Sequence, residues 1–365
     1  SKGPMHRRFA VLALAAFAPW TALACGDSPD AVLVDGGSDA VVESPNDGGP
    51  RDDAATNDAS SQDAAVGDGG PIDAGPASDP AEPGPFSVAV SNASVTAAST
   101  GDTFSAIVAT PSGAGPFPVV VFGHGFQLPA SQYTSYAKHL ASHGYLAVIP
   151  DFPTGFSSNF IRDAKDLVAT IDAVTRGNGA RGDASRVGVT GHSRGGKAAV
   201  LAAGLDARIK AVLALDPVDG AGGFSTCNTT TECPPAATTL AALQIPIGYL
   251  GETLDANGGT FGQACAPASG NFQVFYGASK PPAFAVDIKG ASHMSFLDNP
   301  NCGFTCSACS TATADHDTVL ALARNYEVAF FDRHLRGQAG RDSYLTGADA
   351  QRRYVASGQA TIASK

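Results

Sequence analysis

Short apolar runs alternate with amphipathic stretches between residues 118 and 335. The apolar runs are rich in valine, isoleucine and leucine and predict six buried strands, at residues 118–123, 145–150, 186–190, 210–216, 245–250 and 283–288. The other stretches show helical spacing of apolar residues and predict helices at residues 131–143, 159–175, 194–205 and 316–335, with Ser131 as the N-cap of the first. Strands without a polar face are covered on both sides, so we expect a mostly parallel sheet with helices on both faces.

The N-terminal residues do not follow this pattern. Residues 5–24 contain two arginines, an apolar stretch and the tripeptide Ala22-Leu23-Ala24, which predicts an export signal. The apolar stretch is shorter than the roughly 20 residues that a membrane-spanning helix needs. Cys25 resembles the acylated cysteine of bacterial lipoproteins, but Ala-Leu-Ala is a poor match to the motif that precedes such a cysteine. Both a lipidated cell-envelope protein and a freely secreted protein therefore remain open.

Residues 25–85 predict a disordered tether. From Gly26 to Pro85 the chain has twelve aspartates and two glutamates against one arginine, and almost no aromatic residues. Such a segment buries too little apolar surface to offset the entropy of ordering it. The tether accounts for the net charge of −11, and the remaining residues 86–365 are nearly neutral. A nucleic-acid partner is not expected, because nucleic-acid-binding proteins carry a basic surface.

Six of the seven cysteines lie within residues 86–365, which we predict to be one α/β domain. An even number of cysteines in an exported chain predicts disulfides, and Cys227 and Cys233 flank one polar loop and are expected to pair. A zinc site formed by Cys302, Cys306 and Cys309 with Cys265 as the fourth ligand is the less favoured alternative.

Ser193 stands in Gly191-His192-Ser193-Arg194-Gly195, between a predicted strand and a predicted helix. Gly-x-Ser-x-Gly in this context is typical of the sharp turn that presents a nucleophilic serine in α/β-hydrolases. The motif alone is weak in a chain with 42 glycines. A serine nucleophile also requires a general base, an acid that orients the base, and donors for the oxyanion.

His293 is the best candidate for the base among eight histidines. It follows the last predicted strand, which gives the chain order serine, acid, histidine that α/β-hydrolases show. His192 is expected to point away from Ser193 and to pack or form a hydrogen bond, and His124 is expected to shape the turn after its strand.

The acid has several candidates. Asp216 ends the strand at residues 210–216, and Asp219 follows three residues later. Glu252 and Asp255 follow the next strand, which is the more common place for the acid in this fold. For the oxyanion, the main-chain N–H groups of Arg194 and Phe126 are the expected donors, the latter from the glycine-rich turn after the first strand. No metal or organic cofactor is needed for this chemistry.

Five segments, "HGF", "ASHGYLAVIPD", "GHSRGGKAA", "LDPVDG" and "HMSFLD", resemble chlorophyllase and its bacterial relatives. The segments "ASHGY" and "HGF" are also similar to those of cutinase-like polyester hydrolases. The chlorophyllase and platelet-activating-factor acetylhydrolase pattern implies Asp216 as the acid, whereas the polyester hydrolases imply Asp255. The segment "LDPVDG" favours Asp216, with Asp255 as the alternative.

The resemblance implies an α/β-hydrolase fold and a serine carboxylic-ester hydrolase, and the predicted signal at residues 5–24 implies that the protein is exported. Polyester hydrolases usually have methionine after the nucleophile and a tryptophan in the site, whereas Arg194 follows Ser193 here and the only tryptophan is Trp20 in the predicted signal. The ester substrate is a small molecule, a lipid or a polyester. Other candidate functions are lactone hydrolysis or acyl transfer on the same fold, and a surface-binding protein derived from an inactive hydrolase.

Overall fold

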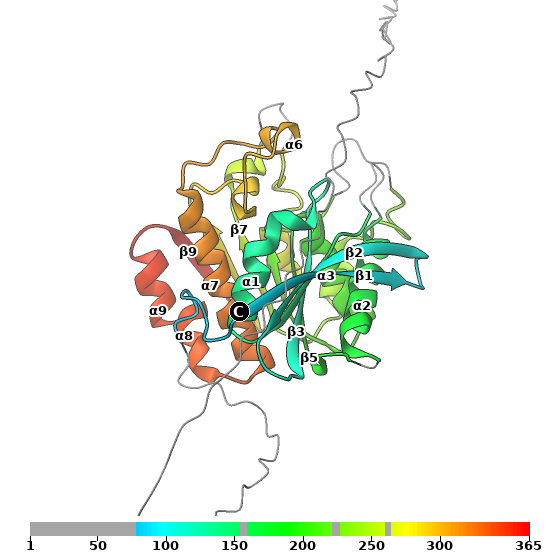
Figure 1. Ribbon diagram of the computed structural model, residues 1–365. Helices are drawn as coiled ribbons and strands as arrows, with labels where there is room; N and C mark the ends of the chain where they lie inside the picture. The colour runs from blue at the N-terminus through cyan, green and yellow to red at the C-terminus, as the bar shows by residue number, and fades with distance from the viewer. Residues whose placement is uncertain (1–77, 154–158, 178, 221–226, 260–263) are drawn as a thin grey trace, which may run out of the picture. The chain divides into compact units, whose positions relative to one another are not determined.

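A nine-stranded sheet organises the part of the chain that the computed structural model describes, residues 78–153, 159–177, 179–220, 227–259 and 264–365 (Figure 1). The strand order is β1-β2-β4-β3-β5-β6-β7-β8-β9. The strands are β1 (Val88–Ala97), β2 (Asp102–Pro111), β3 (Phe117–Gly123), β4 (Leu146–Pro150), β5 (Gly182–His192), β6 (Ile209–Leu215), β7 (Ile247–Gly251), β8 (Ala283–Ile288) and β9 (Ala360–Ser364). The six neighbouring strands β4, β3, β5, β6, β7 and β8 pair in parallel. The pairs β1–β2, β2–β4 and β8–β9 are antiparallel. The predicted mostly parallel α/β-hydrolase sheet is therefore confirmed.

Helices cover both faces of the sheet. They are α1 (Thr134–Ser142), α2 (Phe160–Thr175), α3 (Arg194–Leu205), α4 (Ala236–Leu240), α5 (Phe272–Ala278), α6 (Phe304–Ser307), α7 (His316–Leu335), α8 (Asp342–Leu345) and α9 (Ala348–Ala350). Shorter turns are the 3-10 helices η1 (Ala130–Tyr133), η2 (Leu254–Ala256), η3 (His293–Phe296) and η4 (Ala339–Arg341) and the π-helix η5 (Gln351–Val355). In the described regions no helix combines the length and the apolar character needed to cross a membrane.

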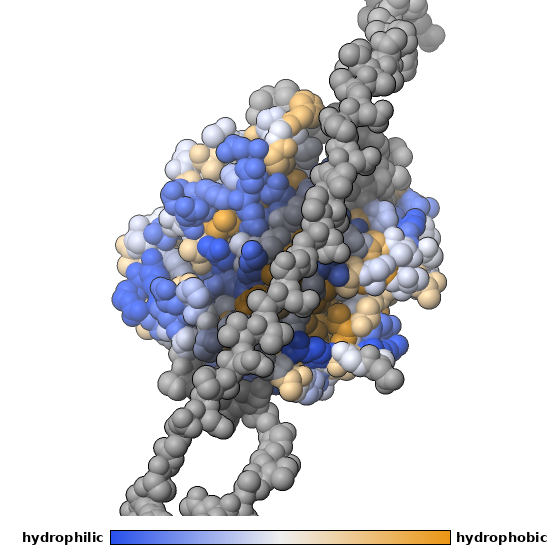
Figure 2. Space-filling model, in the orientation of Figure 1, coloured by the Kyte–Doolittle hydropathy of each residue, from blue (hydrophilic) through white to orange (hydrophobic). Residues whose placement is uncertain are grey.

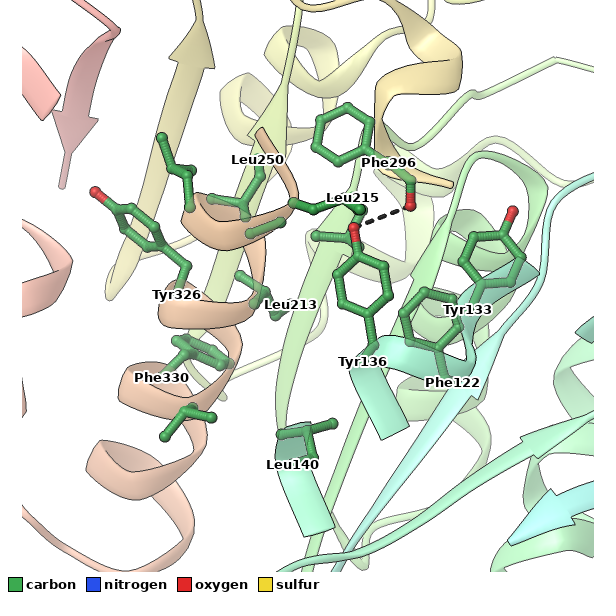
Figure 3. Packing of buried hydrophobic residues seen from close by; sticks show 14 of the residues in the cluster. Phe122, Tyr133, Tyr136, Leu140, Leu213, Leu215, Leu250, Phe296, Tyr326 and Phe330 are labelled. Atoms are coloured by element: carbon green, nitrogen blue, oxygen red, sulfur yellow. Dashed lines mark hydrogen bonds between the residues drawn. The ribbon is translucent and has the colours of Figure 1, made fainter. Parts of the chain in front are cut away.

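Two apolar cores lie on the two faces of the sheet. The core that contains α1 and α7 includes Phe122, Tyr136, Leu213 and Tyr326 (Figure 3). In this core the hydroxyl of Tyr136 donates to the carbonyl oxygen of Phe296 at 2.9 Å, which attaches η3 to α1 (Figure 3). The core on the other face packs α2, α3 and α5 against the sheet. The visible surface around α9 is mostly hydrophilic (Figure 2).

All six predicted strands and all four predicted helices are present: α3, α7 and β8 have the predicted bounds, and the ends of the others are shifted. The sequence did not reveal β1, β2 and β9, because these antiparallel strands lack the continuous apolar runs of the parallel strands. The expectation that Ser131 caps the first helix is wrong, because Ser131 lies inside η1 and α1 begins only at Thr134.

Residues 78–85, which the composition assigned to the tether, are described by the structure and contact the domain. The predicted export signal, Cys25 and the tether up to residue 77 lie outside the described residues. Residues 78–85 are held by hydrogen bonds to the domain. The carbonyl oxygen of Pro80 lies 2.8 Å from the Nε2 of His139, and that of Glu82 lies 2.8 Å from the Nε2 of His143. Composition gave no sign of this, because most of these contacts use main-chain atoms of the segment; the carboxylate of Asp79, which pairs with Arg353, is an exception.

All six cysteines of the domain are joined in disulfides. The predicted bridge Cys227–Cys233 is present, and the other two join Cys265 to Cys309 and Cys302 to Cys306. The four cysteines of the alternative zinc site are thus paired with one another.

The Cys265–Cys309 disulfide is expected to stabilise the fold more than Cys302–Cys306. The two bridges join residues 44 and 4 positions apart, and the loop entropy that a bridge removes from the unfolded chain increases with loop length. Replacing Cys265 and Cys309 by serine should lower the free energy of unfolding by about 2–4 kcal/mol. Denaturant unfolding measures this, with the Cys302→Ser/Cys306→Ser variant as the matched control. Equal losses in the two variants would contradict the expectation.

Candidate active site

The carboxyl ends of β5, β6, β7 and β8 meet at one edge of the sheet. In the parallel register His192 lies beside Leu215, Leu215 beside Leu250, and Gly251 beside Asp287. Each of these strands is followed within a few residues by a polar side chain: Ser193, Asp216, Glu252 and His293. Ligands of open α/β sheets bind at this edge.

Ser193 lies in a strained turn between β5 and α3. Its φ of 55° and ψ of −119° are rare for a residue with a side chain, and they project Ser193 out of the strand. The glycines around it allow the turn to pack closely: a Cβ on Gly195 would lie 2.0 Å from the carbonyl oxygen of Gly123 at the end of β3. This close approach explains why the motif requires glycine at that position.

Ser193, His293 and Asp216 form a continuous chain of hydrogen-bonding groups. The Nε2 of His293 lies 2.8 Å from the Oγ of Ser193, and its Nδ1 lies 2.6 Å from the Oδ2 of Asp216. Asp216 is fully buried, and His293 and Ser193 are 3% and 9% exposed, which leaves the serine the most accessible of the three. Burial raises the pKa of Asp216, and the hydrogen bond with His293 opposes that rise.

The other three acid candidates have different partners. Asp255 is buried and accepts two main-chain N–H groups, from His293 at 2.8 Å and from Ser310 at 2.6 Å, so it holds the backbone of the histidine rather than its imidazole. Asp219 pairs with the Nζ of Lys197 at 2.6 Å. The Oε2 of Glu252 accepts the N–H of Asp255 at 2.9 Å.

His192 and Tyr133 join the two loops of the site. The Nε2 of His192 lies 2.9 Å from the carbonyl oxygen of His293, and its Nδ1 lies 2.9 Å from the hydroxyl of Tyr133. The same hydroxyl accepts the N–H of Gly125 at 3.1 Å. Burial and the neighbouring His293 lower the pKa of His192 well below its usual value, so a neutral ring donates from Nε2 and accepts at Nδ1. The prediction of a hydrogen-bonding role for His192 is confirmed, whereas nothing in the sequence pointed to Tyr133.

His124 and the two expected oxyanion donors lie around the turn after β3. The ring nitrogens of His124 lie 2.9 Å from the carbonyl oxygen of Gly125 and 3.2 Å from that of Phe152. The guanidinium carbon of Arg194 lies 5.8 Å from the ring centre of Phe126, which places the two donor-bearing residues side by side.

The side chain of Arg194 forms a buried ion pair. Its Nε and Nη2 donate to the two carboxylate oxygens of Asp163 in α2, at 2.5 and 2.7 Å. Asp163 was not among the residues that the sequence motifs indicated. A buried arginine after the nucleophile needs a buried acid, but the spacing along the chain does not identify which one.

Among the described residues there are two groups of potential metal ligands, and within each group the ligand atoms lie within 4.8 Å of one another. Asp255 lies near Cys265 and Cys309, whose sulfurs are joined to each other in a disulfide. Asp216, Glu252 and His293 form the second group, in which Asp216 and His293 are already hydrogen-bonded to each other.

A cavity of about 740 Å³ lies beside the η3 turn. Its lining includes Ser292, Met294 and His316, but not Ser193, Asp216 or His293. We therefore do not place the reacting atoms in it.

Comparison with known proteins gives a consistent result. A family model described as Chlorophyllase matches residues 78–350. The chain is 31% identical to "Chlorophyllase-1, chloroplastic" of Citrus sinensis over 206 residues, which are 53% of this chain and 60% of the relative. It is 28% identical to "Chlorophyllase type 0" of Chenopodium album over 262 residues, 65% of this chain and 73% of the relative. It is 29% identical to "Chlorophyllase-2" of Arabidopsis thaliana over 212 residues, 54% of this chain and 66% of the relative. The first and third matches thus span less than two thirds of the relatives.

Proposed function

The chain belongs to the chlorophyllase family of α/β-hydrolases, and on that premise we propose that it is an exported serine carboxylic-ester hydrolase with Ser193 as nucleophile, His293 as base and Asp216 as orienting acid. The observation that supports this proposal most directly is the hydrogen-bonded chain from Ser193 Oγ through the imidazole of His293 to Asp216.

In the proposed first step the Oγ of Ser193 attacks the ester carbonyl carbon while the Nε2 of His293 takes the hydroxyl proton. The negative charge moves to the carbonyl oxygen, where the main-chain N–H groups of Phe126 and Arg194 stabilise it. When the tetrahedral intermediate collapses, the bond to the alcohol oxygen breaks and the imidazolium returns the proton to the leaving alkoxide.

In the second step a water molecule replaces the alcohol. The Nε2 of His293 removes a proton from the water, the hydroxide attacks the acyl-enzyme, and the proton passes to Ser193 as the acid leaves. Throughout, Asp216 keeps the Nδ1 of His293 protonated and balances the charge of the imidazolium.

The place of the acid bears on the type of ester. Asp216 follows β6, as in the chlorophyllase and acetylhydrolase pattern, and it is hydrogen-bonded to the imidazole of His293. Asp255, the residue that the polyester-hydrolase pattern selects, instead accepts main-chain N–H groups, from His293 and Ser310. This favours a small-molecule or lipid ester over a polyester. Chlorophyll, which the names of the relatives indicate, is a further candidate.

Export is supported by two features. Residues 5–24 have the composition of an export signal, and all six cysteines of the domain are in disulfides, which are typical of oxidising compartments. Attachment to a membrane through an acylated Cys25 and release as a freely secreted protein are the two outcomes that such a signal allows. Mass spectrometry of the chain expressed in a bacterium would show whether cleavage occurs before Cys25 and whether a lipid is added.

The test of the function is a chain-length series of p-nitrophenyl esters, with chlorophyll assayed alongside. The full chain should hydrolyse the short esters, and its activity should be lost on reaction with a fluorophosphonate that labels Ser193. Absence of hydrolysis across the series, with the serine unlabelled, would instead support a surface-binding protein.

A further inference from the structure

A second buried carboxyl group lies next to the pair of Asp216 and His293. Glu252 is the first residue after β7, and it is fully buried. One carboxylate oxygen of Glu252, one of Asp216 and one ring nitrogen of His293 all lie within 4.8 Å of one another. The Oε2 of Glu252 accepts the N–H of Asp255, but its Oε1 has no hydrogen-bond partner among the described residues. This oxygen needs an explanation, because buried polar atoms are seldom left unpaired.

The charges around Glu252 indicate that it holds a proton while Asp216 is ionised. The titratable groups that face it are Asp216 at the end of β6, Asp255 in η2 and His293 in η3. A single imidazolium balances one negative charge, so a further carboxylate in this buried space would be repelled by Asp216. Burial, followed by the charge of Asp216, raises the pKa of Glu252 to about 9.

We propose that Glu252 is a reserve positioning residue for His293: it is a neutral acid while Asp216 is present, and it ionises to balance the imidazolium when the Asp216 carboxylate is removed. This inference rests on the proposed roles of Ser193 and His293. Glu252 acts through His293 and does not touch the substrate. It stands directly after the strand where this fold more commonly carries the acid, so the chain has a carboxyl group at both positions.

The residue that replaces Asp216 determines whether Glu252 can balance the charge of the His293 imidazolium. In Asp216→Asn, the amide oxygen is held by the N–H of Glu252, which donates to Asp216 Oδ1 at 3.3 Å in the present structure. The amide NH₂ then faces the Nδ1 of His293 and stabilises the wrong tautomer, whatever Glu252 does. Asp216→Ala leaves Nδ1 free to keep its proton, so an ionised Glu252 can stabilise the imidazolium.

The experiment measures kcat/KM on a p-nitrophenyl ester for Asp216→Ala, Glu252→Gln and the double variant. We expect Asp216→Ala to lose about 10²–10³-fold, and Asp216→Ala/Glu252→Gln to lose about 10⁴-fold, the loss typical of a triad without its acid. Glu252→Gln should cost much less when Asp216 is intact. The matched control is Glu327→Gln, another fully buried glutamate with an unpaired oxygen, which bonds Thr190 instead. The variant Asp216→Ala/Glu327→Gln should have the same kcat/KM as Asp216→Ala.

The pH profile separates a charge effect from a packing effect. In Asp216→Ala the kcat/KM should rise with pH as Glu252 ionises, over a range above the usual glutamate pKa because Glu252 remains buried. The double variant should lack that rise. Asp216→Ser, which leaves a smaller cavity, repeats the series if the alanine variant does not fold. Equal rates and profiles with and without Glu252 would overturn the inference, whereas the proposed function would fail only if the unmodified chain were inactive.

Discussion

Replacing Ser193 with alanine is expected to lower kcat on a short p-nitrophenyl ester by about 10⁴–10⁶-fold. Without the hydroxyl, no acyl-enzyme forms, and the Nε2 of His293, 2.8 Å from the lost oxygen, has no proton to accept. The remaining rate would come from substrate binding and from the N–H groups of the oxyanion site. The substitution should leave the fold intact, because alanine retains the Cβ that the strained turn already accommodates.

The matched control for Ser193→Ala is Ser185→Ala. Ser185 is an exposed serine on the same strand, near the end opposite Ser193. A fluorophosphonate should label the original chain and Ser185→Ala once per molecule and should not label Ser193→Ala. Labelling of a different serine, or retained turnover in Ser193→Ala, would remove Ser193 as the nucleophile.

The sequence revealed those parts of the fold whose burial is continuous along the chain. Strand β3, and β6 after the exposed Lys210, have uninterrupted buried residues because helices cover both of their faces. Strand β2 buries alternate residues, and β1 is mostly exposed, so neither has a comparable run. These antiparallel strands are specified by their pairing with neighbours, which a single sequence does not display.

The candidate site could be predicted in part for a related reason. The order of Ser193, Asp216 and His293 along the chain reflects the order of strands, and parallel strands bring their carboxyl ends together. The role of Asp255 depends instead on loops: its two donors come from η3 and from Ser310, beside the Cys265–Cys309 disulfide. Which N–H a buried carboxylate accepts is decided by the path of these loops, and sequence spacing does not encode that path.

Asp216→Asn is expected to lower kcat by about 10⁴-fold, which corresponds to about 5 kcal/mol of transition-state stabilisation. The amide has nearly the shape of the carboxylate, but its NH₂ group would face the Nδ1 of His293, now 2.6 Å from Asp216 Oδ2. The imidazole would then carry its proton on Nε2 and could not accept the proton of Ser193. Steady-state kinetics give the loss, and the melting temperature should show that the fold is retained.

Asp255→Asn should affect stability more than the reaction. The oxygen of asparagine can accept only one of the two N–H groups that Asp255 now accepts, and its NH₂ would face the other. Leaving a buried donor unpaired costs about 1–3 kcal/mol of folding free energy. The turnover should fall only about tenfold, through a less firmly held His293, because the imidazole keeps its bond to Asp216 and hence its tautomer.

We therefore expect Asp216→Asn and Asp255→Asn to differ by at least about a hundredfold in kcat. The reverse ranking would make Asp255 the acid, as the polyester-hydrolase pattern implies, and two equal, mild losses would mean that neither carboxylate orients the base.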